Sequence, residues 1–340
     1  MLIEKTKKLT EINGVSGDEG AVREYIKSQI SNYADQVFTD TMGNIIALKK
    51  GNSEKKVMLS AHMDEVGFIV SGITEKGYIE FKSVGGIDTR VIISKKVTIG
   101  KKRVKGIIGM KAIHLQKRAE RESVPQLKEL YIDIGASSKD EALKHVSLGD
   151  YIAFETTAEI LGSDTLKAKA IDDRAGCAIL MELMKKPVVY DTYFCFTTQE
   201  EVGLRGARIC AHRIEPDIAL VVESTTCSDV YGYEEHEYVT NMGGGAVVTF
   251  MDRTTIVENS FRKWLYDSAK NNSIPVQYKR TTAGGNDCGR IHLAKGGVRA
   301  ASVSVPCRYL HSPCGLASIT DINAVYKLAE MFLDKICEVI

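Results

Sequence analysis

The stretch of sequence that decides how this chain folds is Tyr193-Phe194-Cys195-Phe196-Thr197-Thr198-Gln199-Glu200-Glu201-Val202-Gly203-Leu204-Arg205-Gly206-Ala207. It begins as an apolar strand, continues with two adjacent carboxylates, and enters a helix through a turn marked by glycine. Neighbouring acids at a strand end point in different directions, so one can bind a metal while the other faces a substrate as a general base. Most exposed acids are simply solvated, and an acidic pair by itself indicates only a loop. A functional role for this acidic pair is better supported because the same arrangement recurs along the chain.

Four further apolar runs end at, or close to, a side chain that can bind a metal. Residues 57–61 precede His62, residues 168–171 precede Asp172, residues 218–222 precede Glu223, and residues 301–305 lead towards His311. Strands that alternate with helices indicate an α/β sheet. Functional groups of such sheets gather at the carboxyl ends of the strands. We therefore expect a single crevice that contains His62, Asp172, Glu200, Glu201, Glu223 and His311.

This set of side chains suits two metal ions. Each ion would have one imidazole and one terminal carboxylate, and a further carboxylate would bridge the ions. The three carboxylates would oppose the four positive charges of two divalent ions. A bridging hydroxide, the nucleophile that such sites generate near neutral pH, would balance the remaining charge. Mixed nitrogen and oxygen ligands suit zinc, cobalt or manganese.

The segments around these residues resemble the M42 family of metallo-aminopeptidases, related to glutamyl aminopeptidase and the tetrahedral shell-forming peptidases. The similar segments are residues 60–67, 168–177, 199–203 and 308–313, in the same order as in the family and across nearly the whole chain. The resemblance implies that one metal binds His62 and Glu223. It implies that the other metal binds Glu201 and His311.

The resemblance also assigns roles to the remaining acids. Asp172 would bridge the two metals, Glu200 would be the general base, and Asp64 would orient His62 through its other ring nitrogen. The peptide bond between Asp172 and Asp173 would be cis. Family members often have Asp where this chain has Glu223, and the longer side chain can still bind a metal from a shifted position.

The expected activity is removal of N-terminal residues from short peptides. Three alternatives remain open. A carboxypeptidase or deacylase would use the same metals on a different amide. A glycoside hydrolase would need two unligated carboxylates, and a single tryptophan offers little stacking for sugars. A non-catalytic scaffold would be expected to lack some of the ligands, yet all are present.

Length and composition agree with an enzyme of this kind. The chain has 340 residues, enough for about two domains, and 44% of them are hydrophobic. The net charge of +1 gives no electrostatic reason to expect nucleic-acid or membrane binding. Eight cysteines without CxxC spacing indicate buried reduced thiols. With no signal-like N-terminus and no apolar run of about 18 residues, a cytoplasmic location is expected.

Residues 66–158 differ from the rest of the chain. They hold short β-branched runs separated by glycine, at 68–70, 78–81, 90–93, 96–99, 106–109, 130–134 and 150–154. This spacing predicts a small β-barrel or sandwich. Since His62 and Asp172 flank it, we predict an α/β sandwich catalytic domain, residues 1–65 and 159–340, with an inserted β-barrel. The resemblance implies that the insert forms subunit contacts in a homo-oligomer, either a dimer or a twelve-subunit shell.

Several other motifs have simpler interpretations. Residues 16–19 resemble a capping box that opens a helix at 21–31. His236 lies in a polar connection and is expected in a solvated loop, and Asp287 is expected to cap a helix. The glycine-rich stretches 242–245 and 283–286 are expected near the cleft. Arg308 could bind substrate or pair with a structural acid.

Overall fold

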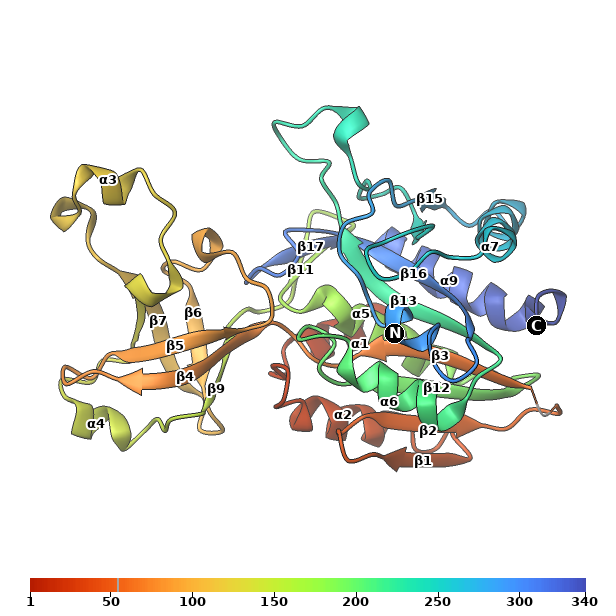
Figure 1. The fold of residues 1–340 in the computed structure, drawn as a ribbon, viewed down its shortest axis with the longest axis horizontal. Coiled ribbons are helices and arrows are strands. Elements are labelled where there is room, and N and C mark those ends of the chain that lie inside the picture. Colours follow the sequence, from red (N-terminus) through yellow and green to blue (C-terminus); the bar gives the residue numbers. More distant parts are fainter. Residues whose placement is uncertain (54) are drawn as a thin grey trace.

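The structure is a computed structural model that describes residues 1–53 and 55–340. A large mixed sheet lies at one end of the molecule and a closed six-stranded barrel at the other (Figure 1). The sheet follows the order β1-β2-β12-β3-β13-β16-β17-β11-β10, with β14 and β15 beside β16. Its strands are β1 Gln36–Thr39, β2 Ile45–Lys49, β3 Lys56–His62, β10 Glu159–Leu161, β11 Thr165–Ala168, β12 Asp191–Thr197, β13 Ile218–Thr226, β14 Ala246–Val248, β15 Val276–Tyr278, β16 Arg299–Arg308 and β17 Gly315–Ser318.

Alternating side chains on the central strands create two cores, one on each face of the sheet. On β3, Leu59 points into one core and Met58 into the other. Helices on the first face are α1 Leu2–Thr10, α2 Gly20–Ile30, α5 Ile171–Leu183, α7 Asn259–Asn271 and α9 Ile319–Lys335. Helices on the second face are α6 Arg205–Ile214 and α8 Cys288–Ile291. The predicted α/β sandwich is thereby confirmed.

The inserted barrel has a core of its own. Its strands close in the order β4-β5-β8-β7-β6-β9. Phe68 packs edge to face against Phe81 and Phe154, with ring centroids 4.9 and 5.4 Å apart. The elements of this part are β4 Gly67–Ile73, β5 Ile79–Val84, β6 Lys96–Ile99, β7 Val104–Met110, β8 Leu130–Asp133, β9 Tyr151–Phe154, α3 Arg118–Arg121 and α4 Lys139–Leu143.

Two local predictions, one before α2 and one in the barrel, were wrong. Residues 90–93 are not a strand, because the Asp88 side chain accepts the main-chain N–H of Arg90 and starts a 3₁₀ turn. The capping box at 16–19 is also absent. No side-chain hydrogen bond caps α2, and Ser16 Oγ instead donates to Asp64 Oδ2 at 2.6 Å.

Buried charged side chains connect the start of α5 with the end of β3 and with the segment after α1. The Arg174 guanidinium donates to the carbonyls of Met63, Leu9 and Ile12. Lys169 Nζ lies 2.5 and 2.7 Å from the two carboxylate oxygens of Glu65. Buried charges persist when they are paired in this way. The start of α5 is therefore fixed relative to β3. Among the described residues, no helix combines the length and apolarity needed to cross a membrane.

Candidate metal centre

The carboxyl ends of four parallel strands meet at one edge of the sheet. β12 pairs in parallel with β3, β3 with β13, and β13 with β16. Such an edge is where α/β proteins build their sites. The side chains found there are His62 at the end of β3, Glu223 on β13, Glu200 and Glu201 after β12, Asp172 at the start of α5, and His311 after β16.

Asp172 lies between the two histidines. Its Oδ1 is 3.2 Å from His62 Nε2, and its Oδ2 is 3.4 Å from His311 Nε2. Glu223 Oε2 lies 3.5 Å from His62 Nε2, and Glu201 Oε2 lies 3.2 Å from His311 Nε2. The result is two half-sites that share one carboxylate, each with its own imidazole and its own second carboxylate.

Because these acids are buried, holding them together in their charged form costs free energy unless a cation is bound. Burial raises the pKa of Glu201 to about 8 and also raises the pKa of Glu223 and Glu200. Although burial opposes it, the hydrogen bond to Asp172 and the charge of Glu201 raise the pKa of His311 to about 9. Buried carboxylates are normally paired or bound to metal. Among the described residues, Glu223 Oε1 finds no hydrogen-bond partner, which suits a ligand atom.

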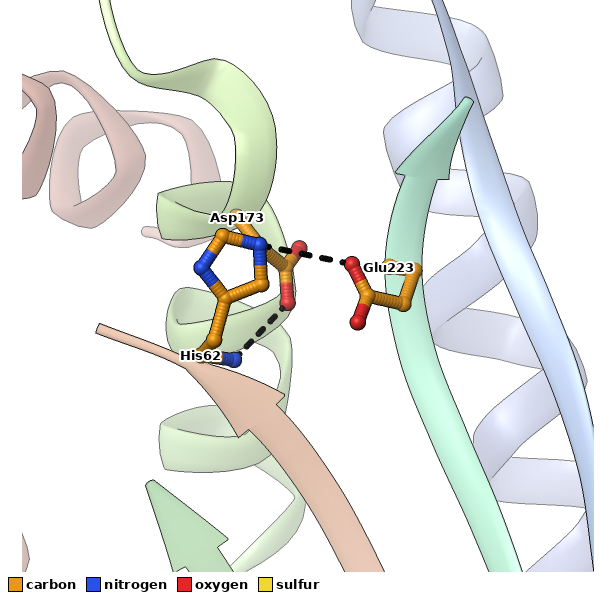
Figure 2. A group of neighbouring side chains, drawn as sticks. All are labelled: His62, Asp173 and Glu223. Carbon is orange, nitrogen blue, oxygen red and sulfur yellow. Dashed lines mark hydrogen bonds and ion pairs between the residues drawn. The ribbon is translucent and has the colours of Figure 1, made fainter. Parts of the chain in front are cut away.

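Asp173 lies close to the same cluster, but its carboxylate accepts hydrogen bonds from the main chain. Figure 2 shows it beside His62 and Glu223, and the three could hold a cation by proximity alone. Its Oδ2 accepts the main-chain N–H of His62 at 3.3 Å, and its Oδ1 accepts that of Gly176 at 3.0 Å. The Asp172–Asp173 peptide bond is cis, which confirms the expectation from the resemblance. A second compact group contains His62, Asp172 and Glu201.

Asp64 contacts both His62 and the loop that carries Glu200 and Glu201. His62 Nδ1 lies 3.1 Å from the Asp64 carbonyl oxygen and 3.5 Å from its Oδ1. The Asp64 carboxylate also accepts the main-chain N–H groups of Glu200 and Glu201, at 3.0 and 3.1 Å. Asp64 thus contacts His62 as expected and has a second task that the sequence pattern did not indicate.

The loops around the site adopt left-handed backbone conformations at non-glycine residues. The φ angles are 50° at Ala170, 56° at Gln199, 59° at Leu204, 60° at Tyr309 and 55° at His311. Each such conformation costs roughly 1–3 kcal/mol and persists where the surroundings enforce it. Their gathering next to the candidate ligands is typical of a functional site.

An open cleft of about 740 Å³ leads to the acids. The residues that line it include Lys279, Arg253, Asn286 and Arg290, together with the acids Asp172, Glu200 and Glu223. Lys279 Nζ donates to the Ala283 carbonyl at 3.0 Å, and burial lowers its pKa. The glycines near 284 line this cleft as expected. The sequence did not identify Lys279 as a residue of the cleft, because an isolated lysine after a short strand forms no recognisable motif.

Other singled-out residues have structural roles. Arg308 forms two hydrogen bonds with Asp229, at 2.8 and 2.7 Å, which favours the structural alternative. His236 is exposed as expected, but it lies in a short 3₁₀ turn, Glu235–Glu237, rather than in an irregular loop. Gly243 and Gly245 were expected near the cleft but are not among the residues that line it; their main-chain N–H groups donate to Asp321 at 2.6 and 2.7 Å, as part of a structural anchor.

The predicted cap by Asp287 was wrong. No side-chain hydrogen bond caps α8, and Asp287 Oδ2 accepts the Thr197 hydroxyl at 2.6 Å. Burial raises the pKa of this carboxyl to about 7. Because Thr197 pairs with His62 across β12 and β3, Asp287 lies beneath the cluster rather than at a solvent-exposed helix end.

Comparison with known proteins agrees with the geometry. Residues 43–328 match the family model for M42 glutamyl aminopeptidases. A TET aminopeptidase from a marine sediment Thaumarchaeota archaeon is 34% identical, covers 98% of this chain and 96% of its own, and superposes with a TM-score of 0.95. Pyrococcus horikoshii TET1 peptidase, described as able to form a tetrahedron or a large octahedral shell, is 33% identical, with coverage of 98% and 99% and a TM-score of 0.87. A Thermotoga maritima protein described as an endoglucanase is 39% identical, with 98% of both chains covered and a TM-score of 0.82.

Proposed function

The chain belongs to the M42 family of aminopeptidases, and we propose that it releases N-terminal residues from short peptides in the cleft above Asp172. The observation that carries this proposal is the position of Asp172 between two histidines, each with its own second carboxylate. Five such side chains with one shared carboxylate are a donor set for two divalent ions.

We assign one metal to His62 and Glu223 and the other to Glu201 and His311, with Asp172 as the bridge. The unpartnered oxygen of Glu223 and the buried acids support this fit. Two divalent ions in this position would polarise the peptide carbonyl and supply a hydroxide nucleophile near neutral pH. The nitrogen and oxygen ligands suit zinc, cobalt or manganese.

Glu200 is the proposed general base. Its Oε2 lies 4.0 Å from His62 Nε2, next to the candidate ligands, and the residue lines the cleft. Burial raises its pKa, and a carboxylate placed beside the reacting water is one of the usual general bases. In this role its carboxylate takes a proton from the attacking water and returns it to the nitrogen of the leaving amine.

An aminopeptidase must also bind the free N-terminal ammonium. Glu223 is the proposed partner, since it lies on β13 and lines the cleft. A glutamate there reaches further than the aspartate common in the family. We expect this length to influence how the first residue of a peptide is held.

We expect activity on aminoacyl arylamides and short free peptides, and its loss after chelation. Adding back zinc, cobalt or manganese should restore it, because the metals supply the nucleophile. Peptides with an acetylated N-terminus serve as the control and should not react. A requirement for a free C-terminus would instead indicate a carboxypeptidase.

A glycoside hydrolase is the second candidate, because one similar structure is described as an endoglucanase. That chemistry needs two carboxylates free of metal on either side of a sugar. Trp264, the single tryptophan, lies on α7 and is not among the residues that line this cleft. Chelator-insensitive cleavage of an oligosaccharide would favour this candidate.

We further propose that residues 66–158 serve as an oligomerisation domain, inserted into a catalytic domain of residues 1–65 and 159–340. A groove on the outside of the barrel combines the exposed Ile107 with Lys96, Lys105 and Glu155, a mixture suited to contact between subunits. The assembly described for TET1 peptidase supports a homo-oligomer. The free cysteines, most of them buried, fit a reducing compartment such as the cytoplasm.

Light scattering at micromolar concentration should therefore give at least a dimer mass. A twelve-subunit mass would extend the proposal to a closed shell that admits only short peptides. A monomer mass would contradict both, whereas a stable dimer would exclude only the shell.

A further inference from the structure

The carbonyls of the loop that carries Glu200 accept main-chain N–H groups from residues 203–206, as in an ordinary turn, but its own N–H groups are bound by side chains. Its four successive residues, 198–201, each donate a main-chain N–H to a side-chain oxygen. The pairs are Thr198 to Asn44 Oδ1 at 2.9 Å, Gln199 to Glu19 Oε1 at 3.2 Å, Glu200 to Asp64 Oδ1 at 3.0 Å and Glu201 to Asp64 Oδ2 at 3.1 Å.

The three acceptors come from separate parts of the fold and are buried. Glu19 precedes α2, Asn44 precedes β2, and Asp64 follows β3. Their exposed fractions are 4%, 0% and 0%. Main-chain N–H groups in a loop usually bond to water or to nearby carbonyls, so acceptors drawn from three elements fix this loop unusually firmly.

Each acceptor is itself held in place. The Asn44 amide nitrogen donates to Asp40 Oδ2 at 2.7 Å and to the Gly206 carbonyl at 3.2 Å. Glu19 Oε1 also accepts the main-chain N–H of Gly17, at 2.8 Å. The oxygens that receive the loop are thus oriented before any substrate arrives.

The loop needs this support because its backbone is strained. Gln199, directly before Glu200, has a φ of 56°, a left-handed conformation that a side chain with a Cβ disfavours. Glu19 binds the N–H of this residue, and Asn44 binds that of the residue before it. Loss of either acceptor would let the main chain relax, and the Glu200 carboxylate would move with it.

We propose that Glu19 and Asn44 are positioning residues for Glu200. They would act on the reaction only through the main chain, which they hold so that the carboxylate faces the attacking water. This inference rests on the role proposed for Glu200. A displacement of about 1 Å in a catalytic group can lower the rate by roughly 10²-fold. We therefore expect loss of either positioning residue to lower kcat.

Two variants of Glu19 separate the acceptor from the rest of the side chain. Glu19→Gln keeps the Oε1 acceptor, whereas Glu19→Met keeps the length and removes it. We expect Glu19→Gln to retain kcat within about threefold, and Glu19→Met to lose about 10–100-fold in kcat with little change in KM. Metal content should be unchanged in both. Amide hydrogen exchange in a peptide spanning residues 197–204 should accelerate in Glu19→Met only.

Asp321 provides the matched control, because it is also a buried carboxylate that accepts two main-chain N–H groups. Its hydrogen bonds go to residues 243 and 245. Asp321→Leu should therefore lower the melting temperature without slowing turnover or changing exchange in residues 197–204.

The outcomes are distinct. Unchanged kcat and exchange in Glu19→Met would overturn the proposal, as would equal slowing in Glu19→Met and Asp321→Leu. If the unmodified protein releases no N-terminal residues but exchange still rises in Glu19→Met, the proposed function fails while the anchoring of the loop stands. Should Glu19→Met not fold, Glu19→Asp withdraws the acceptor by one methylene and is judged by the same measurements.

Discussion

Replacing Asp172 by alanine should leave the protein folded and almost inactive. Both half-sites lose their shared carboxylate, whose two oxygens lie 3.2 and 3.4 Å from His62 and His311. We expect neither site to hold metal after dialysis. Turnover should fall by roughly 10⁴-fold or more, because several kcal/mol of transition-state stabilisation depend on the ions. Metal analysis and kcat on an aminoacyl arylamide measure the two effects.

Asp217→Ala is the control for this variant. Asp217 binds the main-chain N–H of Lys56 at the opposite end of β3, so its loss should leave metal content and kcat unchanged. Full occupancy of both metal sites in Asp172→Ala would contradict the bridging assignment.

Replacing Glu200 by glutamine should lower turnover by roughly 10²–10⁴-fold, the usual contribution of general acid–base catalysis. Glutamine keeps the size of the side chain but cannot accept and return the proton. Metal content should stay at the unmodified level, because Glu200 is not among the proposed ligands. Inductively coupled plasma analysis beside kcat separates the loss of a base from the loss of a ligand.

Glu201→Gln is the informative partner of this variant. Glu201 lies 3.2 Å from His311, and its replacement should reduce occupancy of that half-site. If Glu200→Gln lost metal and Glu201→Gln kept it, the two roles would have to be exchanged.

The candidate site was largely predictable because its side chains share one local signature. His62 and Glu223 terminate or lie on apolar strands, and Glu200 follows one, so strand period and sheet topology suffice to bring them together. The inserted barrel was predictable for a similar reason, since short β-branched runs separated by glycine recur along it.

The supports of the site were not predictable, because they depend on contacts between distant segments. Ser16 and Glu19 have the spacing of a capping box, yet the structure uses them on Asp64 and Gln199. Asp287 stands at the start of α8, but its carboxylate accepts the hydroxyl of Thr197 at the end of β12. Tertiary hydrogen bonds of this kind override local preference, and no periodicity in the sequence reports them.

The candidate ligands lie far apart in the sequence, so the ribosome synthesises them at different times. His62 leaves the ribosome long before His311, roughly 12–50 s earlier at about 5–20 residues per second. Until His311 emerges, the nascent chain holds at most one of the two imidazoles beside Asp172. A complete site therefore arises only when translation is nearly finished.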